Sequence, residues 1–355
     1  MDILNQRLVN QQIAVHRFHL PEELVCWQGA VQAQDYAMAK WAIGCRLDGI
    51  TETQVEKDFN EGKILRTHVL RPTWHFVSPK DIRWMLALTA PKIKTFTKGH
   101  HRDLGIDSGI LKRSKKIIEK LLKGEGPKTR KEIEQALNKS RIGTDNNRLG
   151  FLLIDAELDG LLCSAGRKGK QFAYGLLEEI VPEFKTRKRE EGIVELAGRY
   201  FGSHGPATVH DFAWWSGLSL SEIKRILPGM GSGLLSQKMD GQDYWFSRSM
   251  AEAKGGPKGI YFLPAFDEYF IGYRDRTHSM DTSFAKRIMG PNGIFNPVIV
   301  RKGRIAGTWK RKEEKSGSMI EAAPFASFKL SDRGVASAMK KYSRYLGRAV
   351  SLAQF

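Results

Sequence analysis

The sequence predicts an α+β fold of tandem winged-helix (helix-turn-helix) units with a β-rich C-terminal domain. Residues 126–133 (GPKTRKEI) and 205–212 (GPATVHDF) share a Gly-Pro turn, a Thr, an acid three residues later and then an apolar residue. This pattern is typical of a capped helix start, because the Thr and the acid each hydrogen-bond a backbone N–H of the first turn. An amphipathic run precedes each start and strand-like segments follow it, which is the element order of a winged helix.

The first predicted unit, residues 1–95, is a more divergent winged helix. A helix that includes Leu24 and Val25 is expected to continue through the segment Gln32-Ala33-Gln34-Asp35-Tyr36 into a small and aromatic run, and to be well buried. Small and aromatic residues dominate that run, which favours a position in the core.

The second half of this unit contains a cap and a hairpin. Thr51, followed three residues later by Gln54, predicts a short helix that ends at Asn60. Residues 64–70 and 73–77 alternate on either side of Arg71-Pro72 and therefore predict a two-stranded wing. Ser78-Pro79 then predicts the start of the next helix, with Pro at its first position.

Residues 96–184 and 185–258 form the second and third predicted units. The hairpin of the second unit has cations at a Gly-bounded tip, residues 166–170 (GRKGK). Such a tip suits a wing that lies over a phosphate backbone, and it equally suits an edge hairpin whose lysines oppose aggregation. The hairpin of the third unit is expected to turn at Asp240-Gly241.

From residue 259 to residue 355 the pattern changes to strands and predicts a small β-rich C-terminal domain. The expected strands cover residues 260–263, 297–300, 304–309 and 325–328, and a closing amphipathic helix covers about residues 332–349.

Charge indicates a polyanionic partner. The chain has 57 Lys and Arg against 39 Asp and Glu, a formal net charge of +18 and a pI near 9.7. An excess of this size drives salt-dependent binding to phosphates, although a solvated basic surface would have the same composition. The expected partner is a nucleic acid, because the repeated winged-helix pattern points to the same kind of ligand as the charge.

Several classes of protein are disfavoured. The length of 355 residues corresponds to about two or three domains. No apolar run approaches a membrane span and the N-terminus lacks the apolar block of a signal peptide, so a cytoplasmic protein without membrane contact is expected. The three cysteines are scattered, which predicts neither disulfides nor a zinc site. The GxxxxGK[ST], GxGxxG, HExxH and GxSxG motifs are absent. We expect no metal and no cofactor.

The clearest candidates for catalysis are Gln32 and Gln34. Residues two apart do not share a face of a helix, but at a helix start or kink both amides could point into one groove. Glutamine is no acid or base near neutral pH, yet its amide donates and accepts hydrogen bonds, so a pair could hold and polarise one water. A water that is oriented but not deprotonated is a weak nucleophile, so it suffices only when the leaving group departs easily. A cationic alkylated purine is such a leaving group. For the motif alone, a cap or helix-lining role is the more frequent outcome.

The chain resembles the AlkZ-like family of winged-helix DNA glycosylases over nearly its whole length. The resemblance rests on several ordered tracts: residues 32–36 (QAQDY), 71–77 (RPTWHFV), 205–218 (GPATVHDFAWWSGL), 263–276 (LPAFDEYFIGYRDR) and 303–309 (GRIAGTW). It implies that Gln32 and Gln34 are the catalytic motif, and the amide at the second position favours the branch of the type member over a sister branch with Asp. It also implies three tandem winged helices that form a concave DNA-binding surface, followed by a β-rich domain. The partner that the resemblance implies is double-stranded DNA in damaged form, and we expect a monomer to bind it.

These observations together predict a monofunctional DNA glycosylase that acts on cationic alkylated purines, with crosslink unhooking as one form of that activity. A DNA-binding protein or regulator without catalysis is the alternative, and release of free base separates the two. His75 is expected to be a hydrogen-bonded wing residue, and Asp267-Glu268 a turn packed on the β-rich domain and neutralised by Arg274 or Arg276. The predicted DNA-binding residues are Arg71, His75, Lys128, Arg130, Arg167, Lys168 and Lys170.

Overall fold

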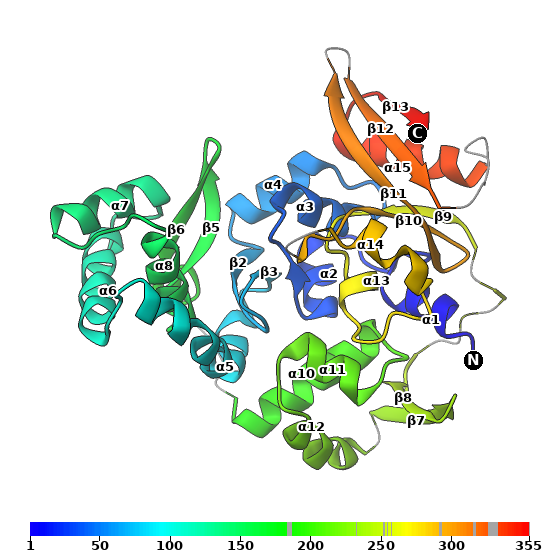
Figure 1. The fold of residues 1–355 in the computed structure, drawn as a ribbon, viewed down its shortest axis with the longest axis horizontal. Coiled ribbons are helices and arrows are strands. Elements are labelled where there is room, and N and C mark those ends of the chain that lie inside the picture. The colour runs from blue at the N-terminus through cyan, green and yellow to red at the C-terminus, as the bar shows by residue number, and fades with distance from the viewer. Residues whose placement is uncertain are drawn as a thin grey trace.

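The computed structural model describes residues 1–182, 187–231, 233–250, 253, 255–256, 258–290, 293–314, 317–325 and 333–354, and these form a mixed α+β fold (Figure 1). The helices are α1 (Ile3–Asn10), α2 (Pro21–Gln28), α3 (Tyr36–Gly44), α4 (Glu52–Asn60), α5 (Ile82–Asp103), α6 (Ser108–Leu122), α7 (Arg130–Lys139), α8 (Arg148–Leu158), α9 (Leu177–Ile180), α10 (Arg189–Ser203), α11 (Val209–Ser216), α12 (Leu220–Ile226), α13 (Glu268–Ile271), α14 (Ala285–Ile288) and α15 (Arg333–Leu346). The strands are β1 (Val31–Gln32), β2 (Leu65–His68), β3 (Trp74–Val77), β4 (Lys128–Thr129), β5 (Leu162–Lys168), β6 (Gln171–Leu176), β7 (Leu234–Met239), β8 (Gln242–Ser247), β9 (Ile260–Leu263), β10 (Val298–Arg301), β11 (Arg304–Glu314), β12 (Gly317–Pro324) and β13 (Val350–Gln354).

The capped helix starts are confirmed. Thr51 accepts from the backbone N–H of Gln54 at the start of α4. Thr129 and Thr208 each form a capping box, with Glu132 at the start of α7 and Asp211 at the start of α11. The apolar residues that follow, Ile133 and Phe212, are both fully buried.

Two expected helix bounds are wrong. The helix that includes Leu24 does not continue into the glutamine segment, because α2 ends at Gly29, whose φ is +79°, and Val31–Gln32 pairs with β3 as a strand. Glycine adopts this left-handed conformation without steric cost. The helix expected from Ser78 begins instead at Ile82, since Ser78 closes a separate turn with the backbone N–H of Asp81.

A six-stranded sheet with the order β1-β3-β2-β5-β6-β4 runs through the N-terminal half of the chain. β2 and β3 form the expected hairpin, and β2 joins β5 where Arg66 faces Ser164. Strands from residues 1–95 and from residues 96–184 therefore share one sheet, and Figure 1 shows β2 and β3 between the α2–α3 region and the lobe of α6, α7 and α8.

The third predicted unit contains α10, α11 and α12 and the separate hairpin β7–β8. The hairpin turns at Asp240 and Gly241, whose φ values of +49° and +76° match the tight hairpin turn expected there. An isolated bridge between Ala207 and Trp245 attaches the hairpin to the turn before α11.

The C-terminal sheet has the order β13-β12-β11-β10-β9, and α15 packs against β9. Three of the four strands predicted here correspond to β9, β10 and β11. Of the fourth, residues 325–328, Phe325 lies after the end of β12 rather than in a strand, and the other three residues lie outside the described part of the chain.

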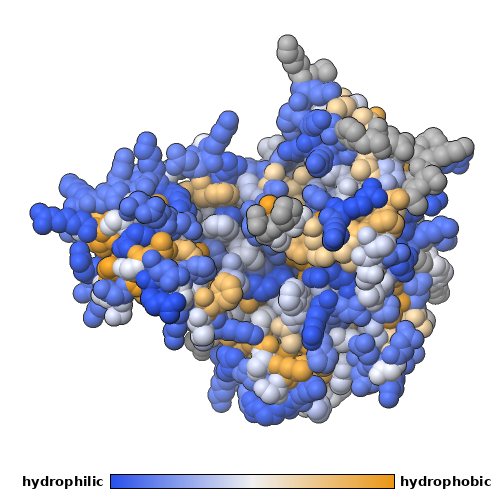
Figure 2. Space-filling model, in the orientation of Figure 1, coloured by the Kyte–Doolittle hydropathy of each residue, from blue (hydrophilic) through white to orange (hydrophobic). Residues whose placement is uncertain are grey.

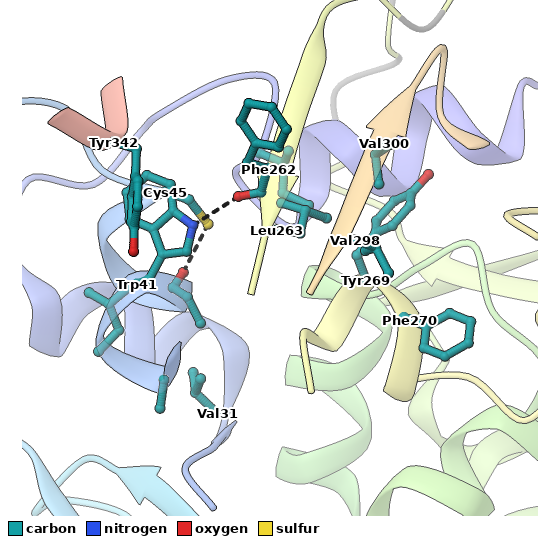
Figure 3. Packing of buried hydrophobic residues seen from close by; sticks show 14 of the residues in the cluster. Val31, Trp41, Cys45, Phe262, Leu263, Tyr269, Phe270, Val298, Val300 and Tyr342 are labelled. Carbon is teal, nitrogen blue, oxygen red and sulfur yellow. Dashed lines mark hydrogen bonds between the residues drawn. The ribbon is translucent and has the colours of Figure 1, made fainter. Parts of the chain in front are cut away.

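This sheet holds the helix that follows the glutamine segment. Trp41 of α3 is 3% exposed and donates its indole N–H to the carbonyl of Phe262 in β9 over 2.8 Å (Figure 3). Tyr342 of α15 packs edge-on against Trp41, with ring centroids 4.6 Å apart. The core therefore runs from α3 across β9, so the C-terminal sheet packs against the helix that directly follows the glutamine segment. No helix in the described ranges is long and apolar enough to cross a membrane.

Candidate active site

The glutamine segment is not helical, and its first glutamine ends strand β1. Gln32 lies opposite His75 in the β1–β3 ladder, and the backbone N–H of Ala33 donates to the carbonyl of Trp74 over 2.7 Å. The strand ends at Gln32, and Gln34 lies in a bend just before α3. The two glutamines therefore do not sit on opposite faces of a helix, and their hydrogen bonds determine where the two amides lie. The side chain of Asp35 then caps α3 by accepting from the backbone N–H of Met38.

Both glutamine amides reach the turn between β2 and β3. Arg71 Nη2 donates to Gln32 Oε1 over 3.1 Å, and Thr73 Oγ1 donates to Gln34 Oε1 over 3.0 Å. Gln32 is 8% exposed, whereas Gln34 is exposed. The pair thus extends from a buried position to the surface.

This arrangement leaves hydrogen-bonding capacity for a ligand. Arginine has only donors, so the oxygen of the Gln32 amide must face Arg71. Each amide oxygen has a second lone pair, and among the described residues no group accepts from the amide nitrogen of Gln32 or Gln34. Each amide oxygen can therefore still accept a hydrogen bond from a water, and each amide nitrogen can donate one to the oxygen of that water. These are the interactions that the positioning of a water requires.

A buried carboxylate lies behind Gln32. Glu268 is 1% exposed, and its Oε1 accepts from the backbone N–H of Gln32 over 3.1 Å. Its Oε2 accepts from the indole N–H of Trp215 over 2.9 Å and lies 3.4 Å from His204 Nε2. Burial disfavours the charged carboxylate, but the hydrogen bond from His204 and the positive charge of Arg71 outweigh it and hold the pKa of Glu268 at about 2. Burial lowers the pKa of His204, so at neutral pH His204 acts as a hydrogen-bond donor rather than as a cation.

The expected neutralisation of Asp267 and Glu268 by Arg274 or Arg276 is wrong. Asp267 instead accepts two hydrogen bonds from the guanidinium of Arg46, each 2.8 Å long, and both side chains are fully buried. Asp267 also caps α13 through the backbone N–H of Tyr269. The buried ion pair fixes the start of α13, and with it the position of Glu268.

Arg66 holds the peptide between the two glutamines from the opposite side. Its Nε donates to the carbonyl of Ala33 over 3.0 Å, and its guanidinium carbon lies 4.4 Å from the ring centroids of Trp74 and Phe172. Arg66 is 3% exposed, and burial lowers its pKa to about 10. Nothing in the sequence near Gln32 indicates Arg66 or Glu268, because Arg66 reaches the segment from β2 and Glu268 from the start of α13 only in the folded chain.

His75 is a hydrogen-bonded residue of the β2–β3 hairpin, as expected, but its proposed contact with DNA is inconsistent with its position. Its side chain is fully buried, and its Nδ1 lies 3.0 Å from the carbonyl of Thr73. Burial lowers its pKa to about 3, with a further contribution from the charge of Arg71. A neutral, enclosed imidazole cannot contact a phosphate, so we assign His75 to the interior of the site.

The other predicted DNA contacts lie along the same six-stranded sheet or at its ends. Lys168 and Lys170 are exposed at the β5–β6 tip. Arg167 is partly occupied, because it pairs with Glu56 at 3.5 Å and donates to the carbonyl of Lys170. Lys128 in β4 and Arg130 at the start of α7 are half-buried next to β6, and Arg71 lies at the β2–β3 turn beside Gln32. The sheet thus carries the glutamine motif at one edge and the cationic hairpin toward the other.

Comparison with known proteins matches most of the chain. The family described as "DNA glycosylase AlkZ-like" matches residues 25–345. The chain is 21% identical over 332 residues to an interstrand DNA cross-link repair glycosylase of Streptomyces sahachiroi, with 90% of this chain and 88% of that protein covered. The solved structure of Streptomyces sahachiroi DNA glycosylase AlkZ superimposes with a TM-score of 0.85 at 19% identity and covers 100% of this chain and 98% of the other.

Proposed function

The chain belongs to the AlkZ-like DNA glycosylase family, and we propose that it hydrolyses the N-glycosidic bond of cationic alkylated purines in duplex DNA, with Gln32 and Gln34 as the catalytic residues. The observation that carries this proposal is that hydrogen bonds hold both amides at the same β2–β3 turn, each with an amide N–H donor and an oxygen lone pair that no described residue occupies. The related Streptomyces sahachiroi protein is named for interstrand DNA cross-link repair. We propose that crosslinks joined through cationic purines are among the substrates here as well.

In the proposed reaction, the bond between the sugar C1′ and the purine nitrogen lengthens, and its electron pair leaves with the base. A cationic purine departs as a neutral molecule, so no acid is needed to protonate it. The sugar acquires oxocarbenium character, and the water held by Gln32 and Gln34 attacks C1′ and then loses its proton to solvent. Orientation of the water and stabilisation by fixed dipoles supply the catalysis.

The groups around the motif fit a mechanism without a strong base. His75 is enclosed and neutral, with its pKa lowered to about 3 by burial. Glu268 is ionised, but both of its oxygens face hydrogen-bond donors and it is 1% exposed, so it cannot take a proton from a water at the motif. The site is therefore suited to leaving groups that depart without help.

We expect excision to be confined to lesions with a positively charged base. Duplexes that contain N7-alkylguanine or N3-alkyladenine should release free base, and duplexes with uracil should release none above background, because an amide orients water but does not deprotonate it fully. Single-turnover assays that detect the released base test this. Excision of uracil would require a stronger base elsewhere, and release of no alkylated base would favour a DNA-binding protein without catalysis.

We also propose that the chain contains three winged helices in series, with units at residues 1–95, 96–184 and 185–258 and a β-rich domain at residues 259–355. The element order supports the second and third units: α6, α7 and α8 precede the hairpin β5–β6, and α10, α11 and α12 precede β7–β8. The matching capping boxes of Thr129 and Thr208 support the same equivalence. The hairpin β2–β3 after α3 and α4 would be the wing of the first unit.

The cationic hairpin tip is the proposed phosphate contact. Hydrophilic side chains cover much of the lobe that contains α6, α7 and the β5–β6 hairpin in the view of Figure 2. Lys168 and Lys170 are exposed there, and no described residue forms an ion pair with either side chain. Both ammonium groups are therefore available to replace counterions on DNA.

Replacement of Lys168 and Lys170 together by Ala should weaken duplex binding and make it less dependent on salt. The slope of log affinity against log salt should become less negative by about 0.9 for each phosphate contact that is lost. Titrations of a labelled duplex at several salt concentrations measure both quantities. The exposed Lys310 on β11 provides a matched control, since Lys310→Ala removes a charge outside this hairpin. Unchanged affinity and slope in the double variant would remove the tip from the DNA interface.

A further inference from the structure

The charge balance at the glutamine site depends on one carboxylate. Arg71 donates to Gln32, and Arg66 donates to the carbonyl of Ala33, so two guanidinium groups contact the catalytic segment. Glu268 contacts the same segment through the backbone N–H of Gln32. A site with two cations and no anion would repel a substrate that is itself cationic, so the negative charge of Glu268 bears directly on substrate choice.

The negative charge is fixed in place. Both oxygens of Glu268 face donors, one from Gln32 and the others from Trp215 and His204. The nearest other carboxylate in the sequence, Asp267, is occupied by Arg46. The hydrogen bond from His204 and the positive charge of Arg71 keep the pKa of Glu268 at about 2, so the group is ionised at neutral pH. In a buried site the field of such a charge is weakly screened.

We propose that Glu268 is a positioning and specificity-determining residue, whose hydrogen bond fixes the Gln32 backbone and whose charge gives the site its preference for a cationic sugar over a neutral one. The inference rests on the proposed function, because the cationic sugar is the transition-state feature of glycosidic hydrolysis. Glu268 acts by positioning Gln32 and by attracting the positive charge on the sugar, and it transfers no proton.

A binding measurement separates the effect of the ligand's charge from the effect of its shape, and it requires no catalytic turnover. Two duplexes are compared, one with a pyrrolidine abasic analogue, which is cationic at neutral pH, and one with a neutral tetrahydrofuran abasic analogue. The wild-type protein should bind the cationic analogue more tightly. Glu268→Gln keeps the size of the side chain and removes the charge, and it should lower the ratio of the two affinities about tenfold, the scale of one unit charge about 10 Å away at an effective dielectric near 20.

Glu268→Asp is the complementary variant, because it keeps the charge and shortens the side chain. It should leave the affinity ratio within about twofold of wild type while single-turnover excision falls, since the hydrogen bond to Gln32 is weakened. Glu314→Gln, at an exposed carboxylate at the end of β11, controls for the loss of one negative charge from the protein as a whole. Circular dichroism and thermal unfolding establish that each variant is folded.

The outcomes are distinct. A residue with a purely structural role would lower both affinities together, so an unchanged ratio in Glu268→Gln would overturn the inference, as would equal affinities in the wild type. If Glu268→Gln does not fold, a lost preference in Glu268→Asp would overturn it. Failure of the wild type to excise any cationic purine would instead overturn the proposed function, because the analogue duplexes test the charge without hydrolysis.

Discussion

Replacement of Gln32 and Gln34 together by Ala should lower single-turnover excision of an N7-alkylguanine by roughly 10²-fold or more, the scale of the loss of a positioned polar group in a catalytic site. The amide oxygens anchor the two side chains to Arg71 and Thr73, and the remaining donors and lone pairs face no described protein group. Removal of both amides deletes the groups that would orient the water. The affinity for duplex DNA should change little, because neither side chain contributes charge.

The control for this experiment is Gln135→Ala. Gln135 is exposed on α7 and lies outside the glutamine segment, so its replacement removes the same kind of side chain without effect on the site. The single variants should each be impaired. An excision rate that is unaltered in the double variant would exclude both glutamines from the mechanism and would require another source of the attacking water's orientation.

Replacement of Asp267 by Ala should lower the free energy of unfolding by about 3–5 kcal/mol, because the guanidinium of Arg46 would remain buried without its counter-charge. Both partners are fully buried and share two hydrogen bonds of 2.8 Å. Excision should fall as well, since Asp267 caps the helix that begins with Glu268. Chemical denaturation followed by circular dichroism measures the loss.

Two comparisons identify the cause of that loss. Glu313 and Arg348 form an ion pair with side chains that are 52% and 42% exposed, so Glu313→Ala should cost less than about 1 kcal/mol. Replacement of the buried pair by Arg46→Met together with Asp267→Leu should be less destabilising than Asp267→Ala alone, because no uncompensated charge remains. If the double variant were less stable than Asp267→Ala, the cause would be lost packing together with the lost hydrogen bonds from Arg46 to Gln11 and Ala42, and not an uncompensated charge.

The features that the sequence predicted correctly are those whose interactions are local. Thr129 and Thr208 contact groups three residues away, so the capping boxes could be recognised from spacing alone. The turn at Asp240-Gly241 likewise requires only that two adjacent residues accept positive φ. The resemblance to the AlkZ-like family predicted the glutamine pair, and the match over residues 25–345 confirms the family.

The features that the sequence did not predict depend on contacts between distant parts of the chain. Gln32 was expected on a helix, and it lies in a strand because β3, about forty residues later, supplies the ladder partner His75. His75 was expected at the DNA surface, and the packing of the same hairpin encloses it. A local pattern carries no information about which strand will pair with a two-residue segment.

The sequence by itself determined the family and the basic character of the protein, and it supplied the hypothesis that Gln32 and Gln34 are catalytic. Only the tertiary structure placed Glu268 against the backbone of Gln32, across 236 positions of sequence, and Arg66 against Ala33 on the other side. The physical reason is that helix caps and turns are closed by neighbours in the chain, whereas a buried charge takes its partners from whichever elements the apolar core brings together. At this site the core joins α3 to β9, and the partners of the glutamine segment follow from that packing.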